Sequence, residues 1–433
     1  MSISPPPSWV PGSQTSGFSL ACLPYGVGAP DGGDPRLLVA IGDHALDLAA
    51  LAEAGLLGPG IPASGPWRAA SLLPLIEAGA DIHRTLRARL RQILAEGAAE
   101  RTLIEPHLHP LGSLDMSVPL SPPDFADFYA SYHHAIRSAA AMRREPVEDA
   151  PSNWKAMPLG YHARSGTVTG PNADIRRPNG QYRSAGTVVT GASRALDFEL
   201  EIGIILSRAS ALGERVAAEA FEQHAFGLTL LNDWSARDLQ RWESVPLGPF
   251  AAKSFATQIG PWVIPIEALL PYGHKTETQA TAADYLRHEG KWTFDIELEV
   301  HLQSAEMRRR GIAPVRITKS NLAHMYWDPA QLLAHLTVNG ASTRAGDLIG
   351  TGTISGPEPS SAACLLELTE AGQPHIALPD GTQRGWLEDG DEVTLSGGVR
   401  RDGTAILSFG QLSGRVAAAH PFPLPIVPIL PRG

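Results

Sequence analysis

The chain has 433 residues, of which 43% are hydrophobic and 18% charged, and its formal net charge at pH 7 is −10. These values indicate a globular protein larger than one ordinary domain and exclude a disordered chain. The negative charge argues against a surface for nucleic acids or other polyanions. Two cysteines allow at most one disulfide, the first residues show no secretory signal, and no apolar run reaches membrane-spanning length. We therefore expect a soluble, cytoplasmic protein that binds neither nucleic acid nor membrane.

Residues 1–118 are predicted to form a small N-terminal α+β domain. Two stretches, GFSLACLPYGV and PRLLVAIGDHALDLAAL, are typical of short strands around a turn. Residues 74–100 have the most regular helical pattern of the chain, with one apolar stripe formed by Leu86, Leu90, Ile93 and Leu94. Four prolines follow within residues 107–124, which are therefore expected to be a linker.

Residues 119–433 are predicted to form a larger, β-rich domain. From Phe125 onward the chain contains short strand-like segments such as GTVVTGA, GPWVIPI, TFDIELEVHLQ and TAILSFGQLSGRV. One helix is expected at residues 321–340, where the pattern stops at a glycine. The predicted fold class is mostly β with some α.

The stretch RALDFELEIGIIL, residues 194–206, alternates apolar and polar residues and predicts a strand with one face in the core. The other face would place three carboxylates in a row, those of Asp197, Glu199 and Glu201. A solvated polar face is the ordinary interpretation of such a strand. The row of like charges therefore becomes informative only if other acids accompany it.

Two further acids favour a bound cation. Asp127 lies among aromatic residues in DFADFYASYHHA, and Asp233 follows an apolar run in LTLLNDWSARD. A carboxylate at the end of a buried strand is costly unless charge or hydrogen bonds compensate it. Oxygen donors from Asp127, Glu199, Glu201 and Asp233 suit a hard divalent cation such as Ca²⁺ or Mg²⁺. No Cys or His pair has zinc spacing, which disfavours a soft-metal site.

Motifs spread along the chain resemble the fumarylacetoacetase family: DFADFYASYHHA, LPLGYHARSG, IRRPNGQ, LDFELEIG, NDWSARDLQRWESVPLGPFAAKSF, HMYWDPAQLLAHLTVNG and GTISGPEP. The N-terminal LPYGV and VAIGDHALDL extend the resemblance to the full-length, two-domain form. The resemblance implies an SH3-like domain at residues 1–118 and a catalytic β-roll at residues 119–433, usually in a homodimer. It also implies hydrolysis of 4-fumarylacetoacetate to fumarate and acetoacetate, the last step of tyrosine and phenylalanine catabolism.

The same resemblance implies the site residues. The metal site comprises Asp127, Glu199, Glu201 and Asp233, with Lys253 and Thr257 beside the ion. His134 and Glu367 form the general-base pair. Developing negative charge is stabilised by Arg237, Gln240 and Lys253. Substrate is bound by Tyr129, Arg143, Tyr161, Gln240 and Thr353. Asp197 matches no ligand of the family.

These residue types suit cleavage of a carbon–carbon bond beside a ketone. A divalent cation can orient a β-diketone, and a histidine with a carboxylate partner can take a proton from water. Cationic donors then meet the developing oxyanion and enolate. Arg237 and Gln240 are three residues apart, so one helical turn would place them side by side. The stretch GPFAAKSF, which contains Lys253, lacks the spacing of a phosphate loop, so a nucleotide site is rejected.

Two adjacent histidines compete for the role of base. Neighbouring side chains on a strand or extended loop point in opposite directions, so we expect only one of them to face the site. The motif favours His134, whereas His133 occupies a position that is commonly non-catalytic in the family.

Two alternatives stay open. The first alternative is an acylpyruvate hydrolase, or a decarboxylase or hydratase of a related oxo-acid. It stays open because Ser244 replaces a substrate-contacting tyrosine of the family. Retention of the His134–Glu367 pair argues against decarboxylation. The second alternative is a non-catalytic, Ca²⁺-stabilised binding protein. Retention of the His134–Glu367 pair, the metal acids and Lys253 disfavours it. The sequence does not decide between Ca²⁺ and Mg²⁺.

Overall fold

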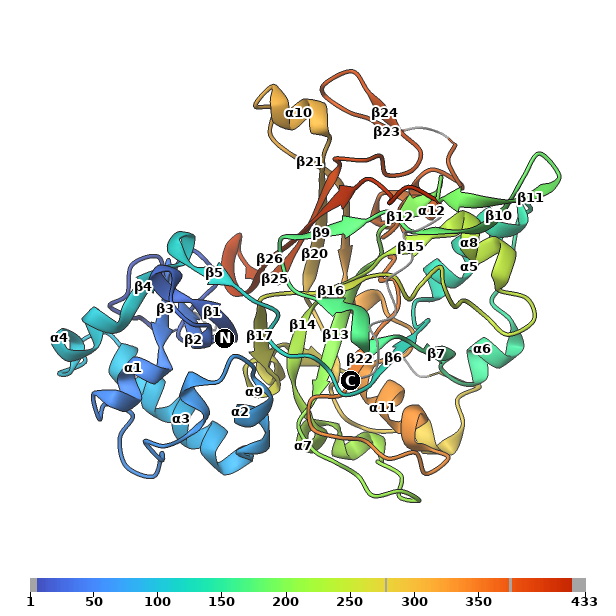
Figure 1. The fold of residues 1–433 in the computed structure, drawn as a ribbon. Coiled ribbons are helices and arrows are strands. Elements are labelled where there is room, and N and C mark those ends of the chain that lie inside the picture. The colour runs from blue at the N-terminus through green and yellow to red at the C-terminus, as the bar shows by residue number, and fades with distance from the viewer. Residues whose placement is uncertain (1–5, 277–278, 374–375, 423–433) are drawn as a thin grey trace, which may run out of the picture.

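A computed structural model describes residues 6–276, 279–373 and 376–422. An N-terminal unit lies beside a larger, sheet-rich part that contains the rest of the chain (Figure 1). The predicted division at residue 118 stays a prediction, and the outermost ends of both predicted domains lie outside the described residues. Among the described residues, no helix is long and apolar enough to cross a membrane.

The N-terminal unit is a small antiparallel sheet covered by helices. Its strands are β1 (Tyr25–Ala29), β2 (Arg36–Ile41), β3 (His44–Asp47), β4 (Leu108–Pro110) and β5 (Asp115–Met116), and its helices are α1 (Leu48–Glu53), α2 (Leu73–Glu77), α3 (Ala80–Leu94) and α4 (Arg101–Ile104). The apolar stripe predicted at Leu86, Leu90, Ile93 and Leu94 lies on α3 and is fully buried, as predicted. The linker predicted at residues 107–124 is partly wrong, because β4 pairs with β3 and β5 pairs with β1.

The sheet of the N-terminal unit continues into the larger part of the protein. Strand β1 pairs antiparallel with β17 (Trp262–Pro265), which places Tyr25 opposite Val263. The order then runs through β14 (Ala225–Asp233), β13 (Leu200–Leu206), β22 (Leu348–Gly350), β6 (Phe125–Phe128) and β7 (Gly160–His162). Two short strands, β16 (Thr257–Ile259) and β8 (Val168–Thr169), extend the side of β14. One 13-stranded sheet therefore joins both parts of the chain.

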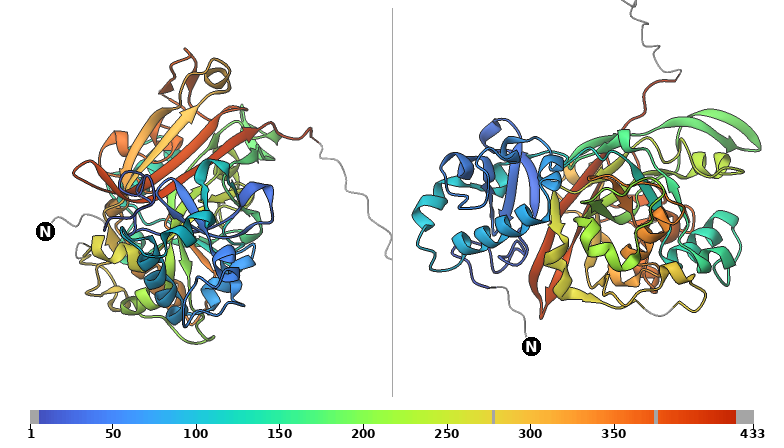
Figure 2. Two further views of the ribbon diagram at one scale, coloured as in Figure 1. Left: turned by 90° about the vertical axis from the view of Figure 1, so that its left-hand side faces the viewer. Right: turned by 90° about the horizontal axis from the view of Figure 1, so that it is seen from below.

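A second sheet packs across this one and closes the main core. Its order is β21 (Val315–Asn321), β20 (Glu297–Gln303), β25 (Glu392–Arg401), β26 (Thr404–Ala417) and β9 (Ala173–Arg176). Leu298, Leu395 and Leu412 of this sheet share one buried cluster with Leu228 and Leu230 of β14. Figure 2 shows the long β25–β26 pair running across the molecule beside the N-terminal unit.

Short elements surround the two sheets. The strand pairs are β10 (Asn179–Ser184) with β11 (Thr187–Ala192), β12 (Leu196–Asp197) with β15 (Ser235–Ala236), β18 (Gly273–His274) with β19 (Thr293–Phe294), and β23 (Ile376–Ala377) with β24 (Gln383–Arg384). The helices are α5 (Tyr132–Arg143), α6 (Ser152–Ala156), α7 (Phe221–His224), α8 (Arg237–Glu243), α9 (Ile266–Leu269), α10 (Ala305–Arg309), α11 (Pro329–Thr337) and α12 (Leu365–Leu368). The β10–β11 hairpin protrudes from the body of the protein (Figures 1 and 2).

The helix predicted at residues 321–340 is shorter than expected. Asn321 ends strand β21, and α11 begins at Pro329. The Asp328 side chain accepts hydrogen bonds from the amides of Ala330 and Gln331, and the Gln331 side chain returns one to the Asp328 amide. This capping box and the proline at the first helical position fix the start of the helix. The expectation of a single helix after Phe125 is also wrong, since eight α-helices lie in the described part of this region.

The strand predicted at residues 194–206 is interrupted and has no solvent face. Strand β12 ends at Asp197, β13 begins at Leu200, and every residue from 195 to 206 is buried. Strand β13 lies between β14 and β22 in the middle of the sheet. Both of its faces are covered, since Leu200, Ile202 and Ile204 pack in one buried cluster and Ile205 packs in another. The prediction of a solvated face is therefore wrong. Each of the three buried carboxylates needs its own compensating partner.

Candidate active site

A cavity of about 360 Å³ opens between the strand ends of the large sheet and helices α5 and α8. Ten of the predicted site residues line it: Asp127, Tyr129, His134, Tyr161, Glu199, Glu201, Arg237, Gln240, Lys253 and Thr353. The remaining lining is mostly apolar and includes Phe128, Met142, Leu159 and Leu247. The structure thus brings together residues that are more than 200 positions apart in the sequence.

Three of the predicted metal acids form a buried cluster. Asp127, Glu201 and Asp233 can each offer one carboxylate oxygen such that all three lie within 4.8 Å of one another. They come from β6, β13 and β14, which lie close together in one sheet, so the strand order itself gathers them. Gly350 of β22 lies opposite Asp127, and a Cβ at this position would be 2.3 Å from Asp127 Oδ1. A glycine is therefore required for the acids to approach each other here.

Neighbouring groups hold the cluster from several sides. The Tyr161 hydroxyl lies 3.0 Å from Asp127 Oδ2 and 2.8 Å from Asp233 Oδ2. Thr257 donates to Asp233 Oδ1 at 2.9 Å, and Lys253 donates to Asp233 Oδ2 at 2.8 Å. Lys253 and Thr257 were predicted to lie beside the metal, and in the structure both fix a carboxylate of the cluster.

Two oxygens of the cluster are left for a further ligand. Asp127 Oδ1 and Glu201 Oε1 are buried and have no hydrogen-bond partner within the described part of the chain. Burial and the charge of Asp233 raise the pKa of Asp127 well above its usual value, and burial and the charge of Asp127 do the same to the pKa of Glu201. Buried oxygens with raised pKa values and a pure oxygen donor set fit a hard divalent cation.

Glu199 is compensated differently from the other acids. One of its oxygens accepts a hydrogen bond from Lys253, and the other lies 2.8 Å from Arg237 Nη2. Burial raises the pKa of Glu199, but Lys253, Arg237 and His134 outweigh it and lower the pKa to about 2. Two cations thus already neutralise this carboxylate, and its place as a fourth metal ligand stays a prediction.

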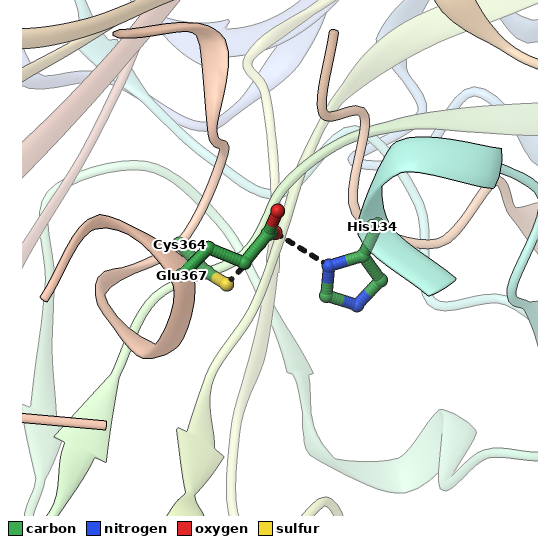
Figure 3. Close-up of side chains that lie close together, drawn as sticks. All are labelled: His134, Cys364 and Glu367. Carbon is green, nitrogen blue, oxygen red and sulfur yellow. Dashed lines mark hydrogen bonds and ion pairs between the residues drawn. The ribbon is translucent and has the colours of Figure 1, made fainter. Parts of the chain in front are cut away.

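The predicted pair of His134 and Glu367 is in contact. His134 lies in the first turn of α5, where the N-cap Ser131 accepts a hydrogen bond from the His134 amide. Its Nδ1 lies 2.5 Å from Oε1 of Glu367, which is on α12 (Figure 3). Burial raises the pKa of Glu367, but the charge and hydrogen bond of His134 outweigh it, so the pKa lies below its usual value. An ionised Glu367 can therefore hold Nδ1–H and leave Nε2 for a water.

Two partners of Glu367 were missed by sequence reasoning. Ser355 Oγ donates to Glu367 Oε1 at 2.7 Å. Cys364 Sγ contacts the same oxygen at 3.3 Å (Figure 3). His134, Cys364 and Glu367 can also offer three ligand atoms within 4.8 Å of one another, although zinc spacing is absent from the sequence. Ligands of one tetrahedral zinc ion lie roughly 3.3 Å apart, given metal–ligand bonds of about 2.0 Å. The 2.5 Å separation of Nδ1 and Oε1 instead fits a hydrogen-bonded pair.

His133 faces a different part of the protein. Both histidines lie on helix α5 and not on the strand or extended loop that was expected. Successive helical positions differ by about 100°, which still separates the two side chains. His133 lines another cavity with Tyr132 and Tyr326, and burial lowers its pKa.

The predicted substrate residues are unequally placed. Thr353 is buried in the cavity wall, and its hydroxyl has no hydrogen-bond partner among the described residues. The ring centroid of Tyr129 lies 5.0 Å from that of His134. Gln240 accepts from Arg237 Nη1 at 3.1 Å on α8, which confirms the predicted neighbouring position. Arg143 is exposed at the end of α5 and is not part of the cavity wall in this structure.

A buried acid cluster, a histidine–glutamate pair and two cations around one cavity define an enzyme of the hydrolase class. The family model "Fumarylacetoacetate (FAA) hydrolase C-terminal" matches residues 125–417, and the model "Fumarylacetoacetase N-terminal" matches residues 21–119. The chain belongs to the fumarylacetoacetase family.

Curated relatives match over nearly the whole chain. The chain is 40% identical to a fumarylacetoacetase of Oryza sativa subsp. japonica over 430 residues, which cover 96% of this chain and 99% of the relative. It is 39% identical to the fumarylacetoacetase of Bos taurus, with 96% and 100% covered, and 38% identical to that of Homo sapiens, with 95% and 99% covered.

Solved structures share the fold. A fumarylacetoacetate hydrolase from Exiguobacterium antarcticum matches with a TM-score of 0.52 at 18% identity and covers 91% of this chain and 99% of its own. A putative HpcE protein from Mycobacterium smegmatis matches with a TM-score of 0.51 at 18% identity, with 91% and 99% covered. The predicted sheet-rich fold class, with a small N-terminal unit and a larger C-terminal part, is confirmed.

Proposed function

We propose that the chain hydrolyses the carbon–carbon bond of 4-fumarylacetoacetate to give fumarate and acetoacetate, the last step of tyrosine and phenylalanine catabolism. The observation that supports this proposal most strongly is that His134, which is paired with Glu367, lines a cavity that Asp127, Glu201 and Lys253 also line. A binding protein without catalysis would have no need for an ion-paired buried histidine aimed at such a cavity.

Asp127, Glu201 and Asp233 would hold the divalent cation, with Glu199 next to them. When bound, Ca²⁺ or Mg²⁺ would act as a Lewis acid toward the oxygens of the β-diketone. Both ions take oxygen ligands, and the carboxylate set suits either of them. The free oxygens Asp127 Oδ1 and Glu201 Oε1 support this assignment.

His134 takes the proton from the attacking water. Glu367 accepts from Nδ1, fixes the ring orientation and stabilises the imidazolium that forms. Ser355 and Cys364 contact the same oxygen of Glu367, Oε1, and help to hold the carboxylate. The proton then passes to the carbanion of the departing acetoacetate, so that both products leave with complete valences.

Lys253, Arg237 and Gln240 face the negative charge that develops on the substrate. Lys253 and Arg237 share Glu199 as a counter-ion, which holds both cations at the cavity wall. Tyr129, Tyr161, Gln240 and Thr353 would bind the substrate carboxylates, and Arg143 would do so only after moving from its exposed position.

A homodimer and a cytoplasmic location are also proposed. Apolar side chains are unusually exposed beside the cavity, with Val245 at 85%, Leu247 at 96% and Phe250 at 78%. Exposed apolar groups of this size support an interface with a second copy. Light scattering on the purified chain measures the mass directly.

The proposed reaction is tested by following fumarylacetoacetate loss spectrophotometrically, with and without chelator. Wild-type protein and the matched variants His134→Gln and His133→Gln are compared. Turnover by wild-type and His133→Gln, with loss in His134→Gln, supports hydrolysis through this pair. Faster turnover of a smaller acylpyruvate than of fumarylacetoacetate would instead support the alternative substrate that Ser244 leaves open.

A further inference from the structure

Asp197 is a fully buried carboxylate outside the cavity wall, and the reaction scheme above gives it no role. Its two oxygens together accept four hydrogen bonds. Oδ1 accepts from the amides of Phe198 at 2.9 Å and Leu365 at 2.7 Å. Oδ2 accepts from the Leu366 amide at 2.9 Å and from Arg237 Nε at 2.8 Å.

These bonds reach the two halves of the site at once. Leu365 and Leu366 begin helix α12, whose next residue is Glu367, the partner of the base. Arg237 begins α8 and pairs through Nη2 with Glu199, which in turn binds Lys253. Asp197 therefore hydrogen-bonds both to the segment bearing Glu367 and to the guanidinium of Arg237.

We propose that Asp197 is a positioning residue that sets the placement of Glu367 relative to Arg237. It touches no substrate and acts through these two groups. This inference rests on the proposed function, in which Glu367 is the partner of the general base and Arg237 stabilises negative charge. It also answers why strand β12 places an acid next to Glu199: the charge of Asp197 is compensated by Arg237 and backbone amides.

The four-bond arrangement is specific for a carboxylate. Each oxygen of Asp197 faces two N–H donors, so an asparagine amide would point its NH₂ at two donors in either orientation. Buried donors that lose their acceptor either move, which displaces α12 or Arg237, or stay unpaired at a cost in stability. A displacement of about 1 Å can lower the rate by roughly 10²-fold.

The chain offers a matched control at Asp391. This aspartate is also fully buried, pairs with Arg384 Nε at 2.7 Å and Nη2 at 2.9 Å, and accepts from the Glu388 amide at 2.8 Å. It takes no part in the cavity wall. Asp391→Asn therefore removes a buried, arginine-paired charge without touching the site, and it separates loss of stability from loss of positioning.

The test is a double-mutant cycle on the full-length, metal-loaded enzyme. We expect Asp197→Asn to lower kcat by about 10²-fold with a smaller effect on KM. In a Glu367→Gln background the same change should cost less than about tenfold, because the two groups act as one unit. Asp391→Asn should keep kcat within about twofold of wild-type. Equal losses in both backgrounds, or an equal loss in Asp391→Asn, would overturn the proposal.

A second readout does not depend on turnover. The imidazole proton between His134 and Glu367 should give a strongly deshielded proton NMR signal, which His134→Gln assigns. We expect the signal to be kept in Asp391→Asn and lost or shifted in Asp197→Asn; an unchanged signal would overturn the proposal. Absence of any diketo-acid turnover in wild-type would refute the proposed function alone. If Asp197→Asn does not fold, Asp197→Glu, which keeps the charge but moves it by one methylene, should show the same shift and a lower kcat.

Discussion

Nδ1 of His134 lies 2.5 Å from Oε1 of Glu367, although 233 residues separate the two in the sequence. Glu367 is held in turn by Ser355, and Ser131 joins the first turn of α5 to the Ser355 carbonyl at 2.8 Å. The His134–Glu367 pair is thus built on helices α5 and α12, and its geometry is fixed by packing and hydrogen bonds.

The first prediction concerns this pair. His134→Ala should lower kcat by ~10²–10⁴-fold, the usual contribution of a positioned general base. Glu367→Gln should also cause a substantial loss, and the double variant should be little worse than the worse single one. Steady-state kinetics of the three variants measures this. His133→Gln serves as the control and should stay near wild-type, and the reverse pattern at the two histidines would refute the assignment.

The second prediction concerns removal of the cation. Chelator should abolish turnover and lower the melting temperature, because the folded state then loses the free energy of binding the cation. Binding to the folded state alone stabilises by about 2.7 kcal/mol at a concentration 100 times the dissociation constant. Asp233→Ala and Glu201→Gln should abolish the dependence of the melting temperature on added Ca²⁺ or Mg²⁺. Full activity and an unchanged melting temperature after chelation would show that no metal is needed.

The third prediction links metal binding to pH. Burial and neighbouring charge raise the pKa values of Asp127 and Glu201, so the metal-free cluster retains protons that a cation must displace. Metal affinity should therefore rise with pH and level off above these raised pKa values. The same raised values mean that the metal-free fold loses stability as pH rises through them.

Calorimetric titration of Ca²⁺ or Mg²⁺ in two buffers of different ionisation enthalpy measures the protons released. Glu201→Gln removes one titrating group and should reduce the release. Binding without proton release across the acidic range would contradict the raised pKa values.

The fourth prediction concerns substrate preference. Ser244 follows α8, and its hydroxyl donates to the Gln240 carbonyl at 2.5 Å, one helical turn from a predicted substrate contact. Ser244→Tyr should shift the ratio of kcat/KM between fumarylacetoacetate and a smaller acylpyruvate, because a phenol adds volume and a donor near the cavity. Ser244→Ala is the control and should leave the ratio unchanged. An unaltered ratio in both variants would place residue 244 outside the substrate's reach.

Much of the site could be predicted because the relevant residues lie in sequence motifs. The motifs locate Asp127, His134 and Lys253, which line one cavity, and Asp233, which accepts a hydrogen bond from Lys253. The helical stripe of α3 was also predictable, since local periodicity alone determines which face is buried.

Long-range burial could not be predicted from local patterns. Alternation at residues 194–206 indicated an exposed face, but both faces of strand β13 pack in buried clusters whose members are distant in sequence. For the same reason the partners of the three carboxylates differ: Arg237 for Asp197, Lys253 and Arg237 for Glu199, and the Gly352 amide for one oxygen of Glu201. Strands β4 and β5 were missed, and residues 107–124 were predicted to be a linker, because these short edge strands are stabilised only by pairing with β3 and β1.

The most direct test of the central claim is product analysis of the purified, metal-loaded enzyme with 4-fumarylacetoacetate, followed by proton NMR. We expect fumarate and acetoacetate in equal amounts, with no product from His134→Gln under the same conditions. Unconsumed substrate, or products of decarboxylation in place of fumarate and acetoacetate, would contradict hydrolysis of the carbon–carbon bond.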